Sequence, residues 1–154
     1  MQKLIIKGSV VEDDWLPADP DSPAPGEGRI LTLDQWLVLA DKSGSAVQLE
    51  PGQAPAPLLP FLEEIELVAV NFPVFTDGRG FSYARELRER GYRGELRATG
   101  HFLRDQLTYL RRCGFDAFQM ADETDLEAAL ERLEDFSEHY QASIDQPLPL
   151  FRRR

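Results

Sequence analysis

The sequence is poor in cysteine, histidine and long apolar runs, and these scarcities exclude several classes of protein. The single cysteine, Cys113, cannot form an internal disulfide, which agrees with a reducing compartment. Together with the two histidines, His101 and His139, it supplies too few ligands for a self-contained zinc or iron–sulfur site. No apolar stretch approaches the roughly 20 residues that a membrane-spanning helix needs. We therefore predict a cytoplasmic protein that has neither a membrane segment nor a metal site.

Basic residues are also few for a chain of this size. The 17 Lys and Arg residues stand against 27 Asp and Glu residues, which gives a formal net charge of −10. The mean field of such a chain repels polyanions, so nucleic acid is not an expected partner. The exception is the basic end formed by Arg152, Arg153 and Arg154. Two interpretations of this end stay open, a solvated tail or a contact with an acidic protein surface.

Motifs that hold redox cofactors are missing as well. The chain contains no G-x-G-x-x-G, no C-x-x-C and no haem attachment motif. The run Gly78, Arg79, Gly80 is only a fragment of a dinucleotide fingerprint, because the third glycine is absent, although an acidic residue follows at Glu95. We therefore predict that the protein holds no cofactor. The sequence leaves open whether it is an enzyme.

The 154 residues fit one α/β domain, since single domains commonly have about 100 to 200 residues. Four parts follow each other along the chain: a hairpin (1–16), a loop rich in proline and glycine (17–29), a region of βα units (30–140) and an extended tail (141–154). The prolines and glycines of the loop deny helix and ladder hydrogen bonds. In the hairpin, two short runs at 4–7 and 10–12 flank Gly8 and Ser9, and we expect both strands at a sheet edge.

Short apolar strands and amphipathic helices alternate over the βα region. The expected strands are 46–49, 67–71, 95–98 and 115–119, and the expected helices are 33–44, 58–64, 82–90, 102–113 and 126–140. Capping boxes open the first and last helices, at Thr32 with Gln35 and at Thr124 with Glu127. The pattern predicts a parallel sheet resembling half of a (βα)8 barrel, with an open doubly wound sheet as the alternative. The strand edges of a half barrel need covering by the hairpin or by a second subunit, so we expect a homodimer.

The candidate binding site lies where the second of these strands ends and a helix begins. Helix-entry N–H groups lack internal partners and the helix dipole favours negative charge, so a glycine-flanked arginine there suits a phosphate, sulfate or carboxylate. Residues after the next strand map to the same edge of the sheet and are expected to join the site. The candidate ligand-binding residues are Asp77, Gly78, Arg79, Gly80, Ser82, Arg97, Thr99 and His101.

A structural interpretation of the same loop stays open. In it, Asp77 caps the loop, the two glycines adopt positive φ, and Arg79 pairs with a neighbouring carboxylate such as Asp105. His101, at a helix start, is either a neutral base or a residue that faces solvent. Cys113 falls in register with apolar residues near the end of its helix, which indicates a core cysteine.

Arg97 alternates with Leu96 and Ala98, so its side chain points to the opposite face of a strand that we expect to be central. A buried arginine must be paired. Asp116 or Asp105 would then form a structural salt bridge with it. Alternatively, Arg97 faces the barrel-like interior as a ligand for an anion.

Several stretches resemble a known bacterial family. They are FPVFTDGRGFS at 72–82, GYRGELRA at 91–98, Asp105 with Gln106, and GFDAF at 114–118. The chain is similar over roughly its last 90 residues to the domain of unknown function 934 family. Members are labelled as oxidoreductases of sulfite reduction, because their genes lie beside that of the sulfite reductase haemoprotein. The resemblance implies a setting in sulfur assimilation, with sulfite reductase or a small anion as partner, and assigns no catalytic residue.

Three functions follow as hypotheses. In the first, the protein is an accessory protein of assimilatory sulfite reduction that acts by protein contact or by binding a small anion. In the second, it is an enzyme in which Arg79 and Arg97 hold an anionic substrate while His101 or Asp77 moves a proton. In the third, it is a structural subunit that dimerises.

Overall fold

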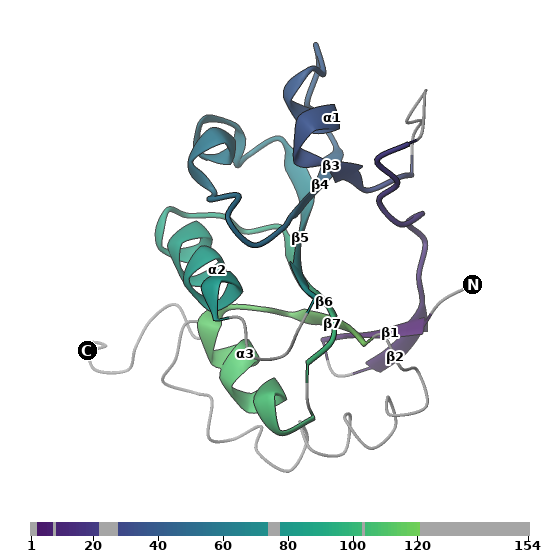
Figure 1. Ribbon diagram of the computed structural model, residues 1–154, viewed down its shortest axis with the longest axis vertical. Coiled ribbons are helices and arrows are strands. Elements are labelled where there is room, and N and C mark those ends of the chain that lie inside the picture. Colours follow the sequence, from purple (N-terminus) through teal and green to yellow (C-terminus); the bar gives the residue numbers. More distant parts are fainter. Residues whose placement is uncertain (1–2, 8, 22–27, 74–77, 103, 121–154) are drawn as a thin grey trace.

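The computed structural model describes residues 3–7, 9–21, 28–73, 78–102 and 104–120 (Figure 1). The expected helix 126–140, the tail 141–154, Asp77 and the middle of the Pro/Gly loop lie outside the described residues. In the part of the chain that is described, no helix has the length and apolar character needed to cross a membrane.

The described residues form a seven-stranded, mostly parallel sheet whose order is β2-β1-β7-β6-β5-β4-β3. Its strands are β1 (Lys3–Ile6), β2 (Ser9–Glu12), β3 (Leu31–Thr32), β4 (Ser45–Leu49), β5 (Ile65–Phe72), β6 (Glu95–Gly100) and β7 (Ala117–Met120). From β3 to β7 each strand pairs in parallel with the next along the chain. Every crossover therefore steps in the same direction, as in half of a (βα)8 barrel, whereas a doubly wound sheet would reverse. The sheet is not closed.

The N-terminal hairpin extends this sheet at one edge. Strand β1 pairs antiparallel with both β2 and β7, so the open edge of β7 is covered by the chain's own first strand. This confirms the hairpin at the sheet edge. The opposite edge is β3, a two-residue strand that the sequence pattern did not predict. A strand so short offers few free hydrogen-bonding groups to another chain.

Among the described residues, the helical segments lie on one face of the sheet, which we call the helical face. The segments are α1 (Leu33–Leu37), the 3₁₀ turns η1 (Ala56–Phe61) and η2 (Arg104–Gln106), α2 (Arg79–Glu89) and α3 (Leu107–Cys113). The apolar side chains of α1, η1, α2 and α3 share one core with the alternate residues Val68, Val70 and Phe72 of β5. Figure 1 shows α2 and α3 side by side against this face. Burial of this core is the main stabilising contribution to the fold.

The other face, which we call the inner face, is covered in part by the segment after the hairpin. Trp15 and Ala18 pack on a small cluster that contains Leu67 and Ala69, the residues that alternate with those of the main core. In Figure 1 this segment runs along the side of the sheet away from α2 and α3. Both faces of β4 and β5 are thus apolar over most of their length, as expected for a parallel sheet.

Some elements differ from the prediction in their bounds. The capping box at Thr32 and Gln35 is present, yet α1 ends at Leu37 and does not reach residue 44. Leu37 and Val38 are exposed, and after them the chain turns so that the Leu39 N–H donates to the Trp36 carbonyl (3.1 Å) and Leu39 packs against the core. The expected helix 58–64 is the 3₁₀ turn η1, which contains Pro60.

Helix α2 begins earlier than predicted. It starts at Arg79, so Arg79 and Gly80 lie in its first turn and not in the preceding loop. Position 80 was expected before the helix, which the sequence pattern placed at 82–90. Packing decides otherwise: a Cβ on Gly80 would lie 2.6 Å from the ring of Phe72 and 2.8 Å from Val70. The absent side chain allows the first turn of α2 to lie directly on β5.

Candidate functional site

The start of α2 lies at the carboxyl edge of the parallel strands, where ligands of α/β proteins bind. Its N-cap is Gly78, which has no side chain, and no side chain among the described residues caps the helix. Gly78, Arg79 and Ser82 are exposed. The start of α2 therefore places one guanidinium group at the surface beside the N-terminal end of the helix dipole. Within its first turn, Gly80 is buried and the Phe81 N–H donates to the Gly78 carbonyl (3.3 Å).

The structural interpretation of the two glycines was wrong in one respect. Gly78 has a φ of −91°, and neither Gly78 nor Gly80 belongs to the glycines with positive φ. Gly80 is required instead by its contact with β5, and a Cβ on Gly78 would meet nothing closer than 3.8 Å. The cap expected from Asp77 lies outside the described residues.

Arg79 lies against the turn that follows β4. Its Nη1 is 3.6 Å from the position that a Cβ on Gly52 would occupy. The turn is fixed by a hydrogen bond from the Gly52 N–H to the hydroxyl of Tyr83 on α2 (2.8 Å), and by one from the Glu50 N–H to the side chain of Gln53 (2.8 Å). The turn 50–53 and the start of α2 thus form adjoining parts of the carboxyl edge.

Thr99 and His101 come from the end of β6 at the same edge. The His101 N–H donates to the carbonyl of Phe72 (2.7 Å), which extends the pairing of β5 and β6 by one residue. Between them, Gly100 has a φ of +109°, and a Cβ there would lie 2.6 Å from the Phe72 carbonyl oxygen. Only glycine suits this position. His101 is exposed, and Thr99 belongs to the inner face because it pairs with Asn71.

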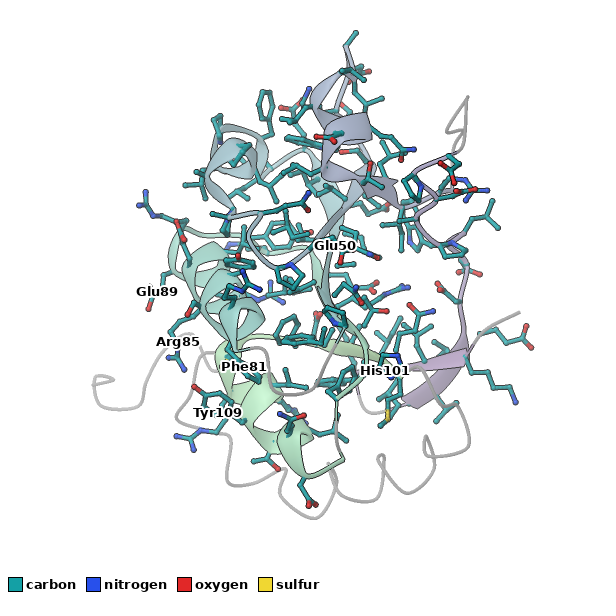
Figure 2. All side chains as sticks on the ribbon, viewed as in Figure 1. Glu50, Phe81, Arg85, Glu89, His101 and Tyr109 are labelled. Carbon is teal, nitrogen blue, oxygen red and sulfur yellow. The ribbon has the colours of Figure 1, made fainter. Side chains whose placement is uncertain are left out.

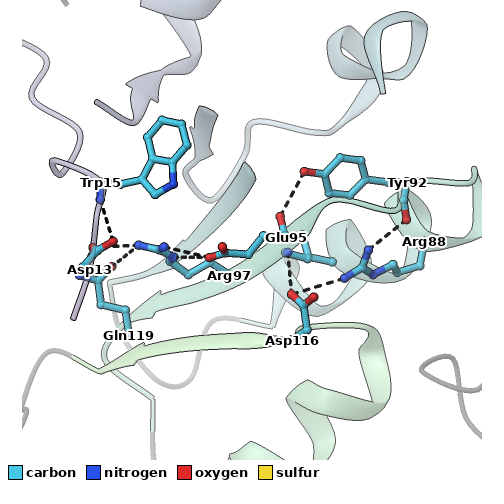
Figure 3. Close-up of polar contacts among 9 residues, drawn as sticks. Asp13, Trp15, Arg88, Tyr92, Glu95, Arg97, Asp116 and Gln119 are labelled. Atoms are coloured by element: carbon cyan, nitrogen blue, oxygen red, sulfur yellow. Dashed lines mark hydrogen bonds and ion pairs between the residues drawn. The ribbon is translucent and has the colours of Figure 1, made fainter. Parts of the chain in front are cut away.

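Arg97 is buried on the inner face with an exposed fraction of 1%, in a network that crosses three segments (Figure 3). Its Nη1 is 3.0 Å from the Asp13 carboxylate and its Nη2 is 2.8 Å from the Glu95 carboxylate. The amide of Gln119 completes the group, with its oxygen 3.4 Å from the Nη1 of Arg97 and its nitrogen 3.3 Å from Asp13. The N–H of Trp15 also donates to Asp13 (3.0 Å).

The predicted pairing of this buried arginine is confirmed, but its partners are Asp13 and Glu95 and neither Asp116 nor Asp105, which were predicted. Ala117 is the residue opposite Arg97, so Asp116, one position earlier, points to the other face. Asp116 accepts a hydrogen bond from the Leu96 N–H (2.8 Å) and lies 3.6 Å from Arg88 (Figure 3). The carboxylates of Asp13 and Glu95 therefore flank the buried Arg97 guanidinium, where an unpaired charge would be costly.

Burial has a clear electrostatic effect on Glu95. It raises the pKa of Glu95 above its ordinary value, and the neighbouring Arg97 guanidinium only partly offsets this rise. The carboxylate of Glu95 therefore has a higher proton affinity than one in water. The group Asp13, Glu95, Arg97 and Gln119 ties β6 and β7 to the segment after the hairpin.

Glu50 is a residue that the sequence interpretation missed. It follows β4 directly, and its two carboxylate oxygens accept hydrogen bonds from the side-chain amides of Gln48 (2.7 Å) and Asn71 (2.8 Å). Glu50 directly follows an apolar strand and precedes Pro51 and Gly52. A polar residue soon after an apolar strand is the same sequence pattern that pointed to the start of α2. Figure 2 shows Glu50 and His101 away from the outward surface of α2 and α3.

Cys113 is fully buried, so its prediction as a core residue is confirmed. The structure adds a neighbour from α2, since the guanidinium of Arg85 lies 3.7 Å from the sulfur. In Figure 2, Arg85 and Tyr109 lie on the side of α2 and α3 that faces away from the sheet. Within the described ranges, no three His, Cys, Asp or Glu side chains are grouped as metal ligands.

Comparison with known proteins supports the resemblance drawn from the sequence. Residues 46–151 match the family described as "Bacterial protein of unknown function (DUF934)". The chain belongs to this family. The match includes β4 to β7 and therefore the whole carboxyl edge described above. No curated protein and no solved structure is significantly similar to the chain.

Proposed function

We propose that this DUF934 protein is a cytoplasmic accessory protein of assimilatory sulfite reduction that binds a small anion at the carboxyl edge of its sheet. The observation that supports the proposal is the start of α2, which has no capping side chain among the described residues and carries Arg79 in its first turn. Amide N–H groups and a guanidinium group at such a position are suited to tetrahedral or pyramidal oxyanions. The setting in sulfite reduction comes from the family resemblance.

Removal of Arg79 should weaken the site without abolishing it. The guanidinium supplies one charge-assisted contact, and the helix N–H groups supply the rest. We expect Arg79→Ala to reduce anion affinity about tenfold, which corresponds to about 1.4 kcal/mol.

A thermal-shift titration tests the proposal. Sulfite, sulfate and phosphate are added separately to wild-type protein, and the melting temperature should rise with concentration, because binding to the native state stabilises it by mass action. Arg79→Ala should need about ten times more anion for the same rise. The matched control is Arg93→Ala, since Arg93 is also exposed but precedes β6 at the amino edge. Equal titration curves for Arg79→Ala and Arg93→Ala would contradict the proposal.

Protein contact is a second candidate function, favoured by the end of α1. Leu37 is 47% exposed and Val38 is 83% exposed, beside the short edge strand β3. Exposed apolar side chains at a sheet edge suit a protein partner, either sulfite reductase or a second copy of the chain. In this case Val38→Asp should reduce co-purification with the sulfite reductase haemoprotein or dissociate a dimer in light scattering. Tyr109→Asp, on the distant surface of α3, should change neither.

A further inference from the structure

The segment that follows β2 crosses the inner face of the sheet, and we call its residues 13–18 the strap (Figure 3). Its apolar contacts with the sheet come from Trp15 and Ala18, which are half-buried against the small apolar cluster of the inner face. Leu16, between them, is 51% exposed. The strap is therefore a single layer of chain, and the apolar surface that it buries is small beside that of the main core.

Polar contacts fix the strap at both of its ends. Near β3, the N–H and the carbonyl of Leu16 form hydrogen bonds with the backbone of residues 28–30 (2.7 and 2.9 Å). Over β6 and β7, the carboxylate of Asp13 lies 3.0 Å from Nη1 of Arg97 and accepts a hydrogen bond from the Trp15 N–H (3.0 Å). Asp13 is therefore the charged connection between the strap and the central part of the sheet.

The Asp13 carboxylate shares its cation with a second carboxylate. Arg97 is 1% exposed, and its Nε and Nη2 both lie 2.8 Å from the carboxylate of Glu95. In the described part of the chain, the salt bridges to these two carboxylates come from Arg97 alone. Gln119, the remaining member of the group, is neutral. When both carboxyls are ionised, this buried group carries one negative charge in excess, and a proton on one of them neutralises it.

The other described groups around Glu95 do not supply a second positive charge. Asp116, which precedes β7, adds to the negative potential there, and the Arg88 guanidinium of α2 is paired with Asp116 (3.6 Å). On β5 the residue opposite Glu95 is the apolar Leu67. The Tyr92 hydroxyl donates to the backbone carbonyl of Glu95 (3.1 Å), and burial raises its pKa, so it is neutral at pH 7. A proton is therefore the charge that can balance the group.

Opening of the strap would change the surroundings of Glu95 in three ways, and each favours the ionised carboxyl. Water would reach the side chain, Asp13 would move away, and the Arg97 guanidinium would be left to Glu95. Burial is the largest cause of the raised pKa of Glu95, Arg97 opposes the rise, and Asp13 adds to it. Glu95 therefore binds a proton more tightly when the strap is closed. By linkage, a proton on Glu95 stabilises the closed strap.

We propose that the strap is a proton-sensitive cover of the inner face, closed most tightly while the Glu95 carboxyl holds a proton and loosened when Glu95 ionises. The proposal is independent of the anion site at the start of α2. A group whose pKa is higher in the closed state stabilises that state below its open-state pKa, and the contribution is lost as pH rises through the closed-state pKa. Loosening uncovers Arg97 and the apolar cluster under Trp15, so access to the inner face increases with pH.

Hydrogen exchange at the Trp15 N–H tests the proposal, because this group donates to Asp13 in the closed strap. Protection factors, which correct for the intrinsic effect of pH on exchange, are measured by NMR on the full chain from pH 5 to pH 8. In wild-type protein the protection of Trp15 should fall by at least about threefold over this range. Glu95→Gln keeps the position neutral, so its protection should stay constant. Glu66→Gln is the matched control, since Glu66 is exposed near the amino end of β5 and the fall should persist.

A second amide separates the strap from the whole fold. The Phe115 N–H donates to the Leu110 carbonyl at the end of α3 (3.2 Å) and reports global stability. If protection at Trp15 and Phe115 falls in parallel, the proposal is wrong. Constant protection at Trp15 in wild-type protein, or a fall that Glu95→Gln retains, would also overturn it.

Should Glu95→Gln fail to fold, Asp13→Asn provides the decisive comparison. Without the Asp13 charge, the pKa of the Glu95 carboxyl, followed by its ¹³C resonance, should be lower than in wild-type protein. An equal or higher pKa would show that Glu95 and the strap are not coupled.

Discussion

Replacing Arg97 with methionine should destabilise the protein by about 3 to 5 kcal/mol, the usual result of removing one partner from a buried ion pair. Methionine preserves most of the side-chain volume, so the loss is electrostatic and not that of a cavity. The Arg97 side chain is 1% exposed, and the partners left behind, Asp13 and Glu95, are 4% and 22% exposed. The two carboxylates would then lie on the inner face without their shared cation.

Urea unfolding at pH 7.5 measures this loss, with Arg93→Met as the control because Arg93 is exposed. The stability lost by Arg97→Met should be smaller at acidic pH than at pH 7.5. Burial already raises the pKa of Glu95, and without Arg97 that pKa rises further. A group whose pKa is raised on folding contributes most to stability below its unfolded pKa, and the contribution is lost as pH rises through the folded pKa. A loss below about 1 kcal/mol, or one that does not change with pH, would refute the role given to Arg97.

Three further predictions concern single positions. Gly80→Ala should destabilise by about 1 to 3 kcal/mol in urea, because its Cβ would meet Phe72 at 2.6 Å, whereas Gly78→Ala should change stability by less than about 1 kcal/mol. Glu95→Gln should gain stability relative to wild type as pH rises above 4.5, the ordinary pKa of that carboxyl, and parallel pH curves for the two proteins would contradict this. Cys113 should react with a thiol reagent only in denaturant, since its side chain is fully buried, and rapid labelling of native protein would show otherwise.

Local pattern was sufficient to predict the architecture. The strands at 46–49, 67–71 and 95–98 were short apolar runs separated by helical periodicity, and such runs form parallel sheets because the crossovers leave no other arrangement. The two-residue strand β3 carried too little pattern to be seen. The early start of α2 also escaped the pattern, because it depends on contact between Gly80 and β5 and not on helix propensity.

The residues of the candidate site could be predicted only where they follow the end of a strand in the sequence. The rule that selected Arg79 and His101, a position soon after an apolar strand, applies equally to Glu50, which follows β4 directly. The partner of Arg97 was a different problem, because Asp13 is 84 residues away in the sequence. Contacts of that range depend on how the hairpin returns across the sheet, which no local pattern contains.

Titration of ¹⁵N-labelled protein with sulfite, followed by amide chemical shifts, tests the central claim most directly. The account predicts that the largest shifts fall on the N–H groups of Gly80, Phe81 and Gly52 at the carboxyl edge, and that Arg79→Ala reduces them. Gly91 and Arg93, at the amino edge, should not move. Shifts confined to the amino edge, or no saturable shift at the start of α2, would contradict the account.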